Sequence, residues 1–217
     1  MDSEEKKLRG EVLKAAKAIH ERGLVETGEG NVSVRVPDRE ELYITPTFND
    51  YGKLIAEDIV RIRFDGTQVS KGRKPSSEYR LHAAVYRAKP KAKCVIHTHS
   101  PYATMLSAAR EKIPVLLEEM AIFLGGEVNV SEYAEANTEK IGAKAVKALG
   151  NRNGTLLANH GALVCGRTVE HTVKMAELVE KMAKVYVGAK LIGKPHKIPQ
   201  KNLKKFLQKH GKDFSTL

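Results

Sequence analysis

Apolar and polar positions repeat along the chain with two periods, and segments of one period alternate with segments of the other. A period of about 3.6 residues predicts a helix over residues 4–22. A period of two predicts strands over residues 32–36 and 41–45, joined by a turn. The same criteria predict further strands over residues 58–64, 67–70, 92–97, 113–117, 128–130, 155–159 and 162–165, and further helices over residues 77–88, 100–110, 138–149, 168–191 and 201–210. This mixture indicates an α/β protein with a mixed sheet.

The length and composition indicate one soluble domain. A chain of 217 residues with 41% hydrophobic and 29% charged residues fits a single domain over residues 1–217 that has a full core and includes a basic C-terminal tail from about residue 193. No apolar stretch is long enough for a membrane span, and the charged N-terminus precedes no apolar signal segment. Cys94 and Cys165 lie in apolar runs and are expected to be buried thiols. We therefore expect a cytoplasmic protein without a membrane partner.

The net charge of +11 leaves two interpretations open. Lys and Arg are spread along the whole chain, and no nucleic-acid-binding module is recognisable, so we expect no nucleic-acid partner. The charge is either a solvated basic surface or a means of attracting anionic substrates. Glutamine is scarce beside abundant Lys and Glu, a composition typical of a thermophilic source.

Three histidines carry the first candidate chemistry. His97 and His99 lie two residues apart at the end of a predicted strand, so their side chains point to the same face. His160 ends a second strand-like run, just before Gly161. Three His ligands without a nearby Cys ligand are typical of an open, catalytic metal site.

Polar loops beside the predicted strands supply further candidates. Residues 28–31 are glycine-rich, residues 45–47 end a strand, and Ser76 and Ser77 precede a predicted helix, where hydroxyls and free amides can bind a phosphate. Each loop alone is more often an ordinary turn or cap. Glu78 is more specific, because a carboxylate beside a divalent cation is a natural general base. His82, one helical turn later, is expected to pack or to form a local pair.

Five motifs occur in the order and spacing of one known family: Asn31-Val32-Ser33-Val34-Arg35, Ile44-Thr45-Pro46-Thr47, Pro75-Ser76-Ser77-Glu78, His97-Thr98-His99 and Asn159-His160-Gly161. With them the chain resembles the class II aldolase/adducin family over residues 8–186. Within the family, the match is closest to the enzymes that act on L-fuculose 1-phosphate. The resemblance implies a three-layer α/β/α fold around a mixed, largely antiparallel sheet, and ring-shaped homotetramers with sites between adjacent subunits.

The resemblance also implies roles for the matching residues. His97, His99 and His160 would hold Zn²⁺, or another divalent ion such as Mn²⁺ or Co²⁺. Glu78 would be the catalytic acid/base and would ligate the metal in the substrate-free state. The positions that would bind the substrate phosphate are Gly30, Asn31, Thr45, Ser76 and Ser77. The implied reaction is the reversible cleavage of a ketose 1-phosphate to dihydroxyacetone phosphate and an aldehyde such as L-lactaldehyde.

Some positions depart from the family pattern. Glu29 stands in the first phosphate loop, and Phe48 stands where the family aldolases have Gly. The Tyr that follows the His pair in those aldolases is missing from residues 117–120. Glu119 is the candidate replacement for this aldehyde-side proton donor, by similarity to the catalytic Glu of methylthioribulose-1-phosphate dehydratases; the alternative is a surface or interface carboxylate.

Two other activities of the superfamily remain alternatives, L-ribulose-5-phosphate 4-epimerase and methylthioribulose-1-phosphate dehydratase. The epimerases usually carry Ser-Ser-Asp at the position of Ser76-Ser77-Glu78, and the dehydratases lack the motif, so Glu78 favours an aldolase. Adducin-type members are binding modules that have lost the ligands. Because this chain keeps the three histidines and Glu78, the sequence predicts an enzyme.

Overall fold

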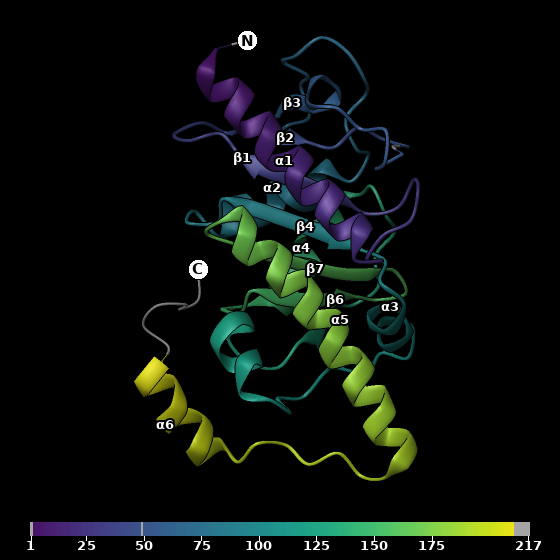
Figure 1. Ribbon diagram of the computed structural model, residues 1–217, viewed down its shortest axis with the longest axis vertical. Helices are drawn as coiled ribbons and strands as arrows, with labels where there is room; N and C mark the ends of the chain where they lie inside the picture. The colour runs from purple at the N-terminus through teal and green to yellow at the C-terminus, as the bar shows by residue number, and fades with distance from the viewer. Residues whose placement is uncertain (1, 49, 211–217) are drawn as a thin grey trace.

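A mixed sheet of seven strands forms the middle layer of the computed structural model, which describes residues 2–48 and 50–210 (Figure 1). The strand order is β3-β2-β1-β4-β7-β6-β5, and every neighbouring pair is antiparallel except the parallel pair β5 and β6. The strands are β1 (Asn31–Arg35), β2 (Glu41–Ile44), β3 (Val60–Arg63), β4 (Cys94–Thr98), β5 (Asn129–Val130), β6 (Gly154–Leu157) and β7 (Gly161–Gly166).

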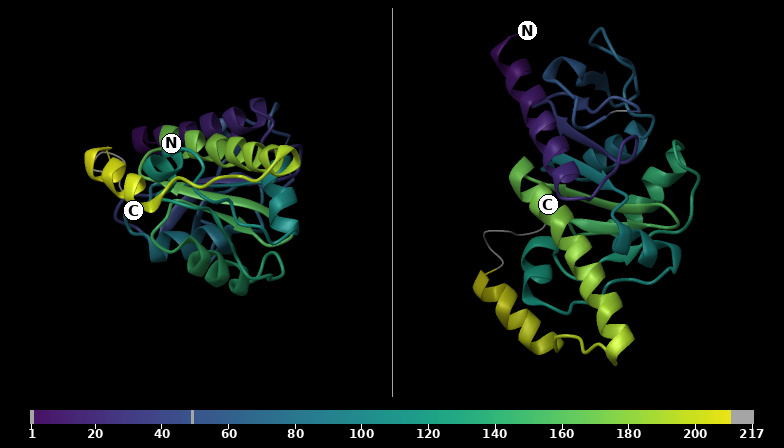
Figure 2. Two further views of the ribbon diagram at one scale, coloured as in Figure 1. Left: turned by 90° about the horizontal axis from the view of Figure 1, so that it is seen from below. Right: turned by 45° about the vertical axis from the view of Figure 1, so that its right-hand side comes forward.

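Helices cover both faces of this sheet. The helices are α1 (Ser3–Glu21), α2 (Tyr79–Ala88), α3 (Pro101–Ala108), α4 (Glu139–Leu149), α5 (Val169–Ile192) and α6 (Gln200–His210), with a 3₁₀ turn, η1 (Ala56–Asp58), and a π-helical turn, η2 (Met120–Leu124). Figure 2 shows α1 and α5 on one face and α4 on the other. Helices α2 and α4 pack together on that second face. The predicted three-layer α/β/α fold with a mixed, largely antiparallel sheet is therefore confirmed.

Alternation along the central strands divides the core between the two faces. In β1 and β4, Val32 and Ile96 pack into the apolar cluster that includes α1 and α5. Val95 packs instead into the cluster that includes α2 and α4. By the period of two, His97 and Asn31 lie on the α2 side of the sheet, where Asn31 is the register partner of His97. The polar ends of β1 and β4 thus meet on the α2 face.

Two predicted strands are single bridges in the structure. Residues 67–70 contribute only the pair Ile62–Gln68, and residues 113–117 only the pair Ile113–Val128. Helix α2 begins at Tyr79, two residues later than predicted, so Ser77 lies on the loop that enters it. Residues 67–70 form a short, mostly polar segment at the edge of the sheet, where further pairing gains little. In residues 113–117, Pro114 has no amide proton to donate, which interrupts pairing after Ile113.

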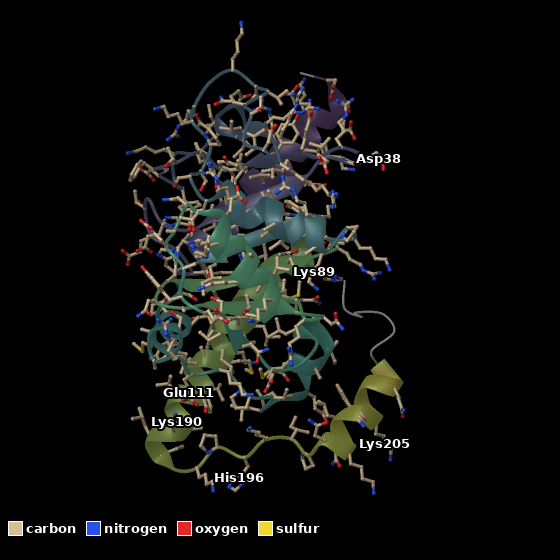
Figure 3. All side chains as sticks on the ribbon, turned by 180° about the vertical axis from the view of Figure 1, so that it is seen from behind. Asp38, Lys89, Glu111, Lys190, His196 and Lys205 are labelled. Atoms are coloured by element: carbon tan, nitrogen blue, oxygen red, sulfur yellow. The ribbon has the colours of Figure 1, made fainter. Side chains whose placement is uncertain are left out.

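The C-terminal helix lies apart from the sheet (Figure 1). A segment without regular structure leads from α5 to α6 and carries His196, while Lys205 lies on α6 itself (Figure 3). The predicted helix over residues 201–210 corresponds to α6, whereas residues 211–217 and Met1 of the expected domain lie outside the described residues. Within the described ranges, no helix is long and apolar enough to cross a membrane. Cys94 and Cys165 are buried, unpaired thiols, as expected.

Candidate active site

The end of the central strand β4 brings four candidate ligands together. His97 lies in β4 and His99 directly follows it, while His160 lies in the turn between β6 and β7. Glu78 occupies the residue before α2. One nitrogen or oxygen from each of these side chains lies within 4.8 Å of those of the other three. The structure therefore gathers the four metal-ligand candidates that the sequence contributes from three distant segments.

The imidazole Nε2 atoms of the three histidines converge on one another. Nε2 of His97 lies 2.9 Å from Nε2 of His99 and 3.1 Å from Nε2 of His160. The carboxylate of Glu78 closes the group, with Oε2 3.4 Å from Nε2 of His97 and Oε1 3.1 Å from Nε2 of His160. Four groups that normally bind protons or cations thus face a common point.

Backbone contacts fix the orientation of the central imidazole. His97 is fully buried, and its Nδ1 lies 2.9 Å from the carbonyl oxygen of Ala162 on the neighbouring strand. Because a carbonyl oxygen only accepts, Nδ1 carries the proton and Nε2 presents its lone pair to the cluster. Burial lowers the pKa of His97 to about 3, against the opposing influence of Glu78, so the ring is neutral at pH 7.

Glu78 is held as a carboxylate. Burial by itself would raise its pKa, but His97, His160 and the amide of Asn31 outweigh burial, and the pKa lies well below its usual range. Nδ2 of Asn31 donates to Oε2 at 2.7 Å. Among the described residues, no hydrogen bond satisfies the buried Oε1.

This donor set fits a divalent cation. Three imidazole nitrogens crowd together beside a buried carboxylate oxygen without a hydrogen-bond partner, an arrangement that is costly by itself and that a cation would satisfy. Three His and one carboxylate suit zinc and also other first-row divalent metals. The hydrogen bond from His97 to a backbone carbonyl is the second-shell contact usual for a metal-binding His.

A cavity of about 190 Å³ opens beside the cluster. The residues that line it are Gly28, Glu29, Gly30, Asn31, Pro46, Thr47, Phe48, Ser76, Ser77, Glu78, His99, Ala136, Asn137 and His160. Four of the five predicted phosphate positions are therefore in the lining. The fifth, Thr45, lies behind it, fully buried, where its Oγ1 accepts a hydrogen bond from the amide of Val32.

Comparison with known proteins places this arrangement in a family. Residues 10–187 match the class II aldolase and adducin N-terminal domain. The chain belongs to the class II aldolase and adducin family. It is 33% identical over 202 residues to the 5-methylthioribulose-1-phosphate/5-deoxyribulose-1-phosphate aldolase of Rhodospirillum rubrum, covering 93% of this chain and 90% of the relative.

Two further relatives are L-fuculose phosphate aldolases. The Escherichia coli protein is 33% identical over 192 residues, which is 88% of each chain. A solved structure of an L-fuculose 1-phosphate aldolase superposes with a TM-score of 0.89 at 32% identity and covers 96% of this chain and 97% of the other. Family membership and the likeness to fuculose phosphate aldolases thus agree with the resemblance found in the motifs.

Glu119 is the candidate proton donor on the aldehyde side, but it does not line the cavity of its own chain. It lies just before η2 and pairs with Lys181 of α5 at 3.2 Å. There it borders a separate hollow of about 720 Å³ formed with α5 and the end of α1. Its own backbone amide and Lys181 lower its pKa. Within one chain, Glu119 is therefore on the α5 side, whereas Glu78 is on the α2 side.

Two residues of the cavity lining were not predicted from the sequence. Ala136 and Asn137 come from the segment before α4, and Asn137 adopts a left-handed backbone conformation with φ of 64°. Asn tolerates this conformation better than most residues, so an Asn directly before the Thr138 N-cap was the available signal. Phe48, noted as a departure, stands at the rim with φ of 48° and 86% of its surface exposed.

Gly30 is constrained by the strand that carries His97. Its φ is +57°, and a Cβ atom there would lie 2.7 Å from the carbonyl oxygen of His97 and 2.5 Å from a methyl carbon of Val25. We expect Gly30→Ala to lower the free energy of unfolding by about 3 kcal/mol, through backbone strain and overpacking. Urea denaturation measures this. Gly10→Ala, in an open part of α1 with nothing near the new methyl, is the control and should raise stability by up to about 1 kcal/mol.

His82 packs in the core, as expected, but its hydrogen-bond partners are distant in the sequence and not local. It is fully buried on α2, where its ring nitrogens contact Asn31 Oδ1 at 2.5 Å and Ser33 Oγ at 2.7 Å. Burial is the main cause that lowers the pKa of His82 to about 4. The histidine is thus neutral in the folded protein over the whole physiological pH range.

This pKa makes stability depend on pH. In the unfolded chain a His titrates near pH ~6.5, so between that pH and about 4 the unfolded state binds one proton more than the folded state. His82 therefore destabilises the fold progressively as the pH falls through this window, by about 2 kcal/mol at pH 5. We expect urea denaturation with a chelator present to show a smaller loss between pH 7 and pH 5 in His82→Gln than in the wild type. Equal losses would contradict the assignment.

Proposed function

We propose that this protein is a metal-dependent aldolase that reversibly cleaves a ketose 1-phosphate to dihydroxyacetone phosphate and an aldehyde. The observation that carries the proposal is the convergence of Glu78, His97, His99 and His160 beside a cavity lined by Ser76 and Ser77. Candidates for a general base, for metal ligands and for a phosphate-binding loop thus lie together beside one cavity. Membership of the class II aldolase and adducin family supports the same conclusion.

The metal would be held by His97, His99 and His160, with Glu78 as a further ligand in the substrate-free state. When bound, it would supply Lewis-acid polarisation of the ketose oxygens. We propose zinc, because three imidazoles and a carboxylate suit it; Mn²⁺ and Co²⁺ remain alternatives.

Glu78 would move the proton. It is ionised and buried, and its Oε2 is positioned by Asn31 while Oε1 has no hydrogen-bond donor among the described residues. A carboxylate with one held and one open oxygen can accept a proton from bound substrate and return it to the carbon next to the carbonyl. Its exclusion from water increases the strength of these interactions.

The phosphate end of the substrate would lie against the loops of residues 28–31 and 76–77. Ser76 and Ser77 precede the N-terminus of α2, where free backbone amides and the helix dipole favour an anion. We propose Gly30, Asn31, Ser76 and Ser77 as phosphate contacts, with Thr45 supporting Asn31's strand from behind. The positive net charge of +11 would favour the approach of such a substrate.

The substrate we propose first is L-fuculose 1-phosphate, with L-lactaldehyde as the second product. Three relatives are about equally similar to this chain. They are named for 5-methylthioribulose 1-phosphate, 5-deoxyribulose 1-phosphate and L-fuculose phosphate. Cleavage of each of these ketose 1-phosphates between C3 and C4 would give dihydroxyacetone phosphate. We also propose a homotetramer, which the resemblance implies, with the site between subunits, because Glu119 can serve as the aldehyde-side proton donor only if a neighbouring chain supplies it.

A panel of phosphorylated sugars tests the proposal. Purified protein with one equivalent of Zn²⁺ is mixed with each ketose 1-phosphate, and dihydroxyacetone phosphate is followed by coupled reduction. We expect release from at least one of the three. If no ketose phosphate is cleaved, any one of three other reactions would overturn the proposal. These are epimerisation of L-ribulose 5-phosphate, dehydration of methylthioribulose 1-phosphate and decarboxylation of a 3-oxo-tetronate 4-phosphate. Another relative, at 31% identity, is named for the last of these reactions.

A further inference from the structure

A chain of buried hydrogen bonds leads away from Glu78 into the core. Nδ2 of Asn31 lies 2.7 Å from Oε2 of Glu78, and Oδ1 of the same amide lies 2.5 Å from Nε2 of His82. The other ring nitrogen of His82 lies 2.7 Å from Oγ of Ser33. Asn31, Ser33 and His82 are at most 2% exposed. This series of hydrogen bonds connects β1 with α2 directly beneath the cavity.

The donor and the acceptor of each hydrogen bond in this series can be assigned. The carboxylate of Glu78 only accepts, so the amide of Asn31 donates to it through Nδ2. The amide oxygen must then accept, which requires the proton of neutral His82 to be on Nε2. Nδ1 of His82 consequently accepts from the hydroxyl of Ser33, whose oxygen lies 2.8 Å from the hydroxyl of Tyr86.

We propose that His82 is a positioning residue for the candidate acid/base. Its Nε2–H holds Oδ1 of Asn31, so that the amide can present only its Nδ2 donors to Glu78 and the cavity. Because Asn31 has this single side-chain acceptor, the hydrogen bond from His82 and the bond to Glu78 together hold the amide in one orientation. The catalytic part of this inference rests on the proposed function, whereas the orientation of the amide does not.

Removal of the donor would leave Oδ1 of Asn31 buried without that partner, and the bond to Glu78 alone would restrain the amide. Any rotation of the amide away from this orientation breaks the bond to Glu78, and a half turn would bring two acceptors into repulsive contact. A primary amide is also a poor proton carrier, so this series of hydrogen bonds does not conduct protons from the core to Glu78. The role of His82 is therefore orientation.

The tautomer of His82 gives a test that needs neither substrate nor activity. Long-range ¹H–¹⁵N spectra of the full-length protein, with the His82→Gln spectrum used for assignment, report which ring nitrogen carries the proton. We expect a neutral ring with the proton on Nε2 at pH 7. A proton on Nδ1, or a doubly protonated ring at this pH, would overturn the proposal whether or not the protein is an aldolase.

Kinetics test the consequence for catalysis. We expect His82→Leu, which cannot donate, to lower kcat per folded site by about 10- to 100-fold, the cost of losing the hydrogen bond from an unrestrained Asn31 to the charged carboxylate of Glu78. His82→Gln can donate to Asn31 and accept from Ser33, so it should retain kcat within about threefold of wild type. The fraction folded and the metal content are measured for each variant.

Val85→Ala is the matched control for destabilisation alone. Val85 is fully buried on the same helix and packs into the apolar cluster of the α2 face, outside the hydrogen-bonded chain. Its kcat per folded site should equal that of the wild type. An equal loss of kcat in His82→Leu and His82→Gln, or no loss in His82→Leu, would contradict the positioning role. If the wild type cleaves no ketose phosphate, the proposed function fails and the tautomer measurement still decides the orientation.

Discussion

Replacement of Glu78 by Gln is expected to lower the rate of ketose phosphate cleavage by about 1,000-fold, within the range usual for loss of a general acid/base. The carboxamide is nearly the same size as the carboxylate and still leaves the three histidines in place. It cannot, however, accept a proton from bound substrate. The measurement is kcat with each cleaved sugar, followed by coupled reduction of dihydroxyacetone phosphate.

The neighbouring carboxylate provides the matched comparison. Glu29 also lines the cavity, but its nearest approach to the histidines is a 3.9 Å contact with Nδ1 of His99. We expect Glu29→Gln to lose less than about tenfold in kcat, because a partly exposed charge at this distance contributes little. Full cleavage by Glu78→Gln at normal metal content would refute the acid/base role.

Replacement of His97 by Ala is expected to abolish metal retention. His97 is the central ligand candidate, since its Nε2 contacts those of both other histidines, and it is fully buried. Loss of one of three nitrogen donors should weaken binding by about 100-fold or more, exceeding the usual effect of a second-shell change. Metal content by elemental analysis should fall from about one ion per chain in the wild type to almost none, and cleavage should stop with it.

Thermal stability gives a second measurement of the same site. A metal that binds only the folded chain at 100 times its dissociation constant stabilises the wild type by about 2.7 kcal/mol. The gain in Tm on adding Zn²⁺ should disappear in His97→Ala. It should persist in His196→Ala, which removes an exposed histidine from the segment between α5 and α6. An undiminished gain in His97→Ala would show that zinc binds elsewhere.

The central elements of the fold were predictable because their apolar pattern and their burial agree. The strands that became β1, β4 and β7 have side chains that alternate between two apolar layers, and both layers are filled. The π-helical turn η2 and the 3₁₀ turn η1 were not predicted, because neither has a repeating pattern long enough to detect. Their conformations depend on tertiary contacts.

The site was predictable as far as local spacing determines it. His97 and His99 share a face because of the strand period, and Glu78 lies beside two serines in one motif. The partnership between Asn31 and His82 was not predicted, since 51 residues separate them and only the packing of α2 on β1 joins them. The same is true of Asn137, which the segment before α4 brings to the cavity.

The central position of β4 separates release of the metal from unfolding. His97 has Asn31 as its register partner on one side and Leu163 on the other, so its backbone lies in the most protected part of the sheet. Amides in such strands exchange with solvent only in the largest opening events of a protein, whereas loops open far more often. Slow hydrogen exchange at the ligand strand would therefore persist while an ion enters or leaves through the cavity mouth.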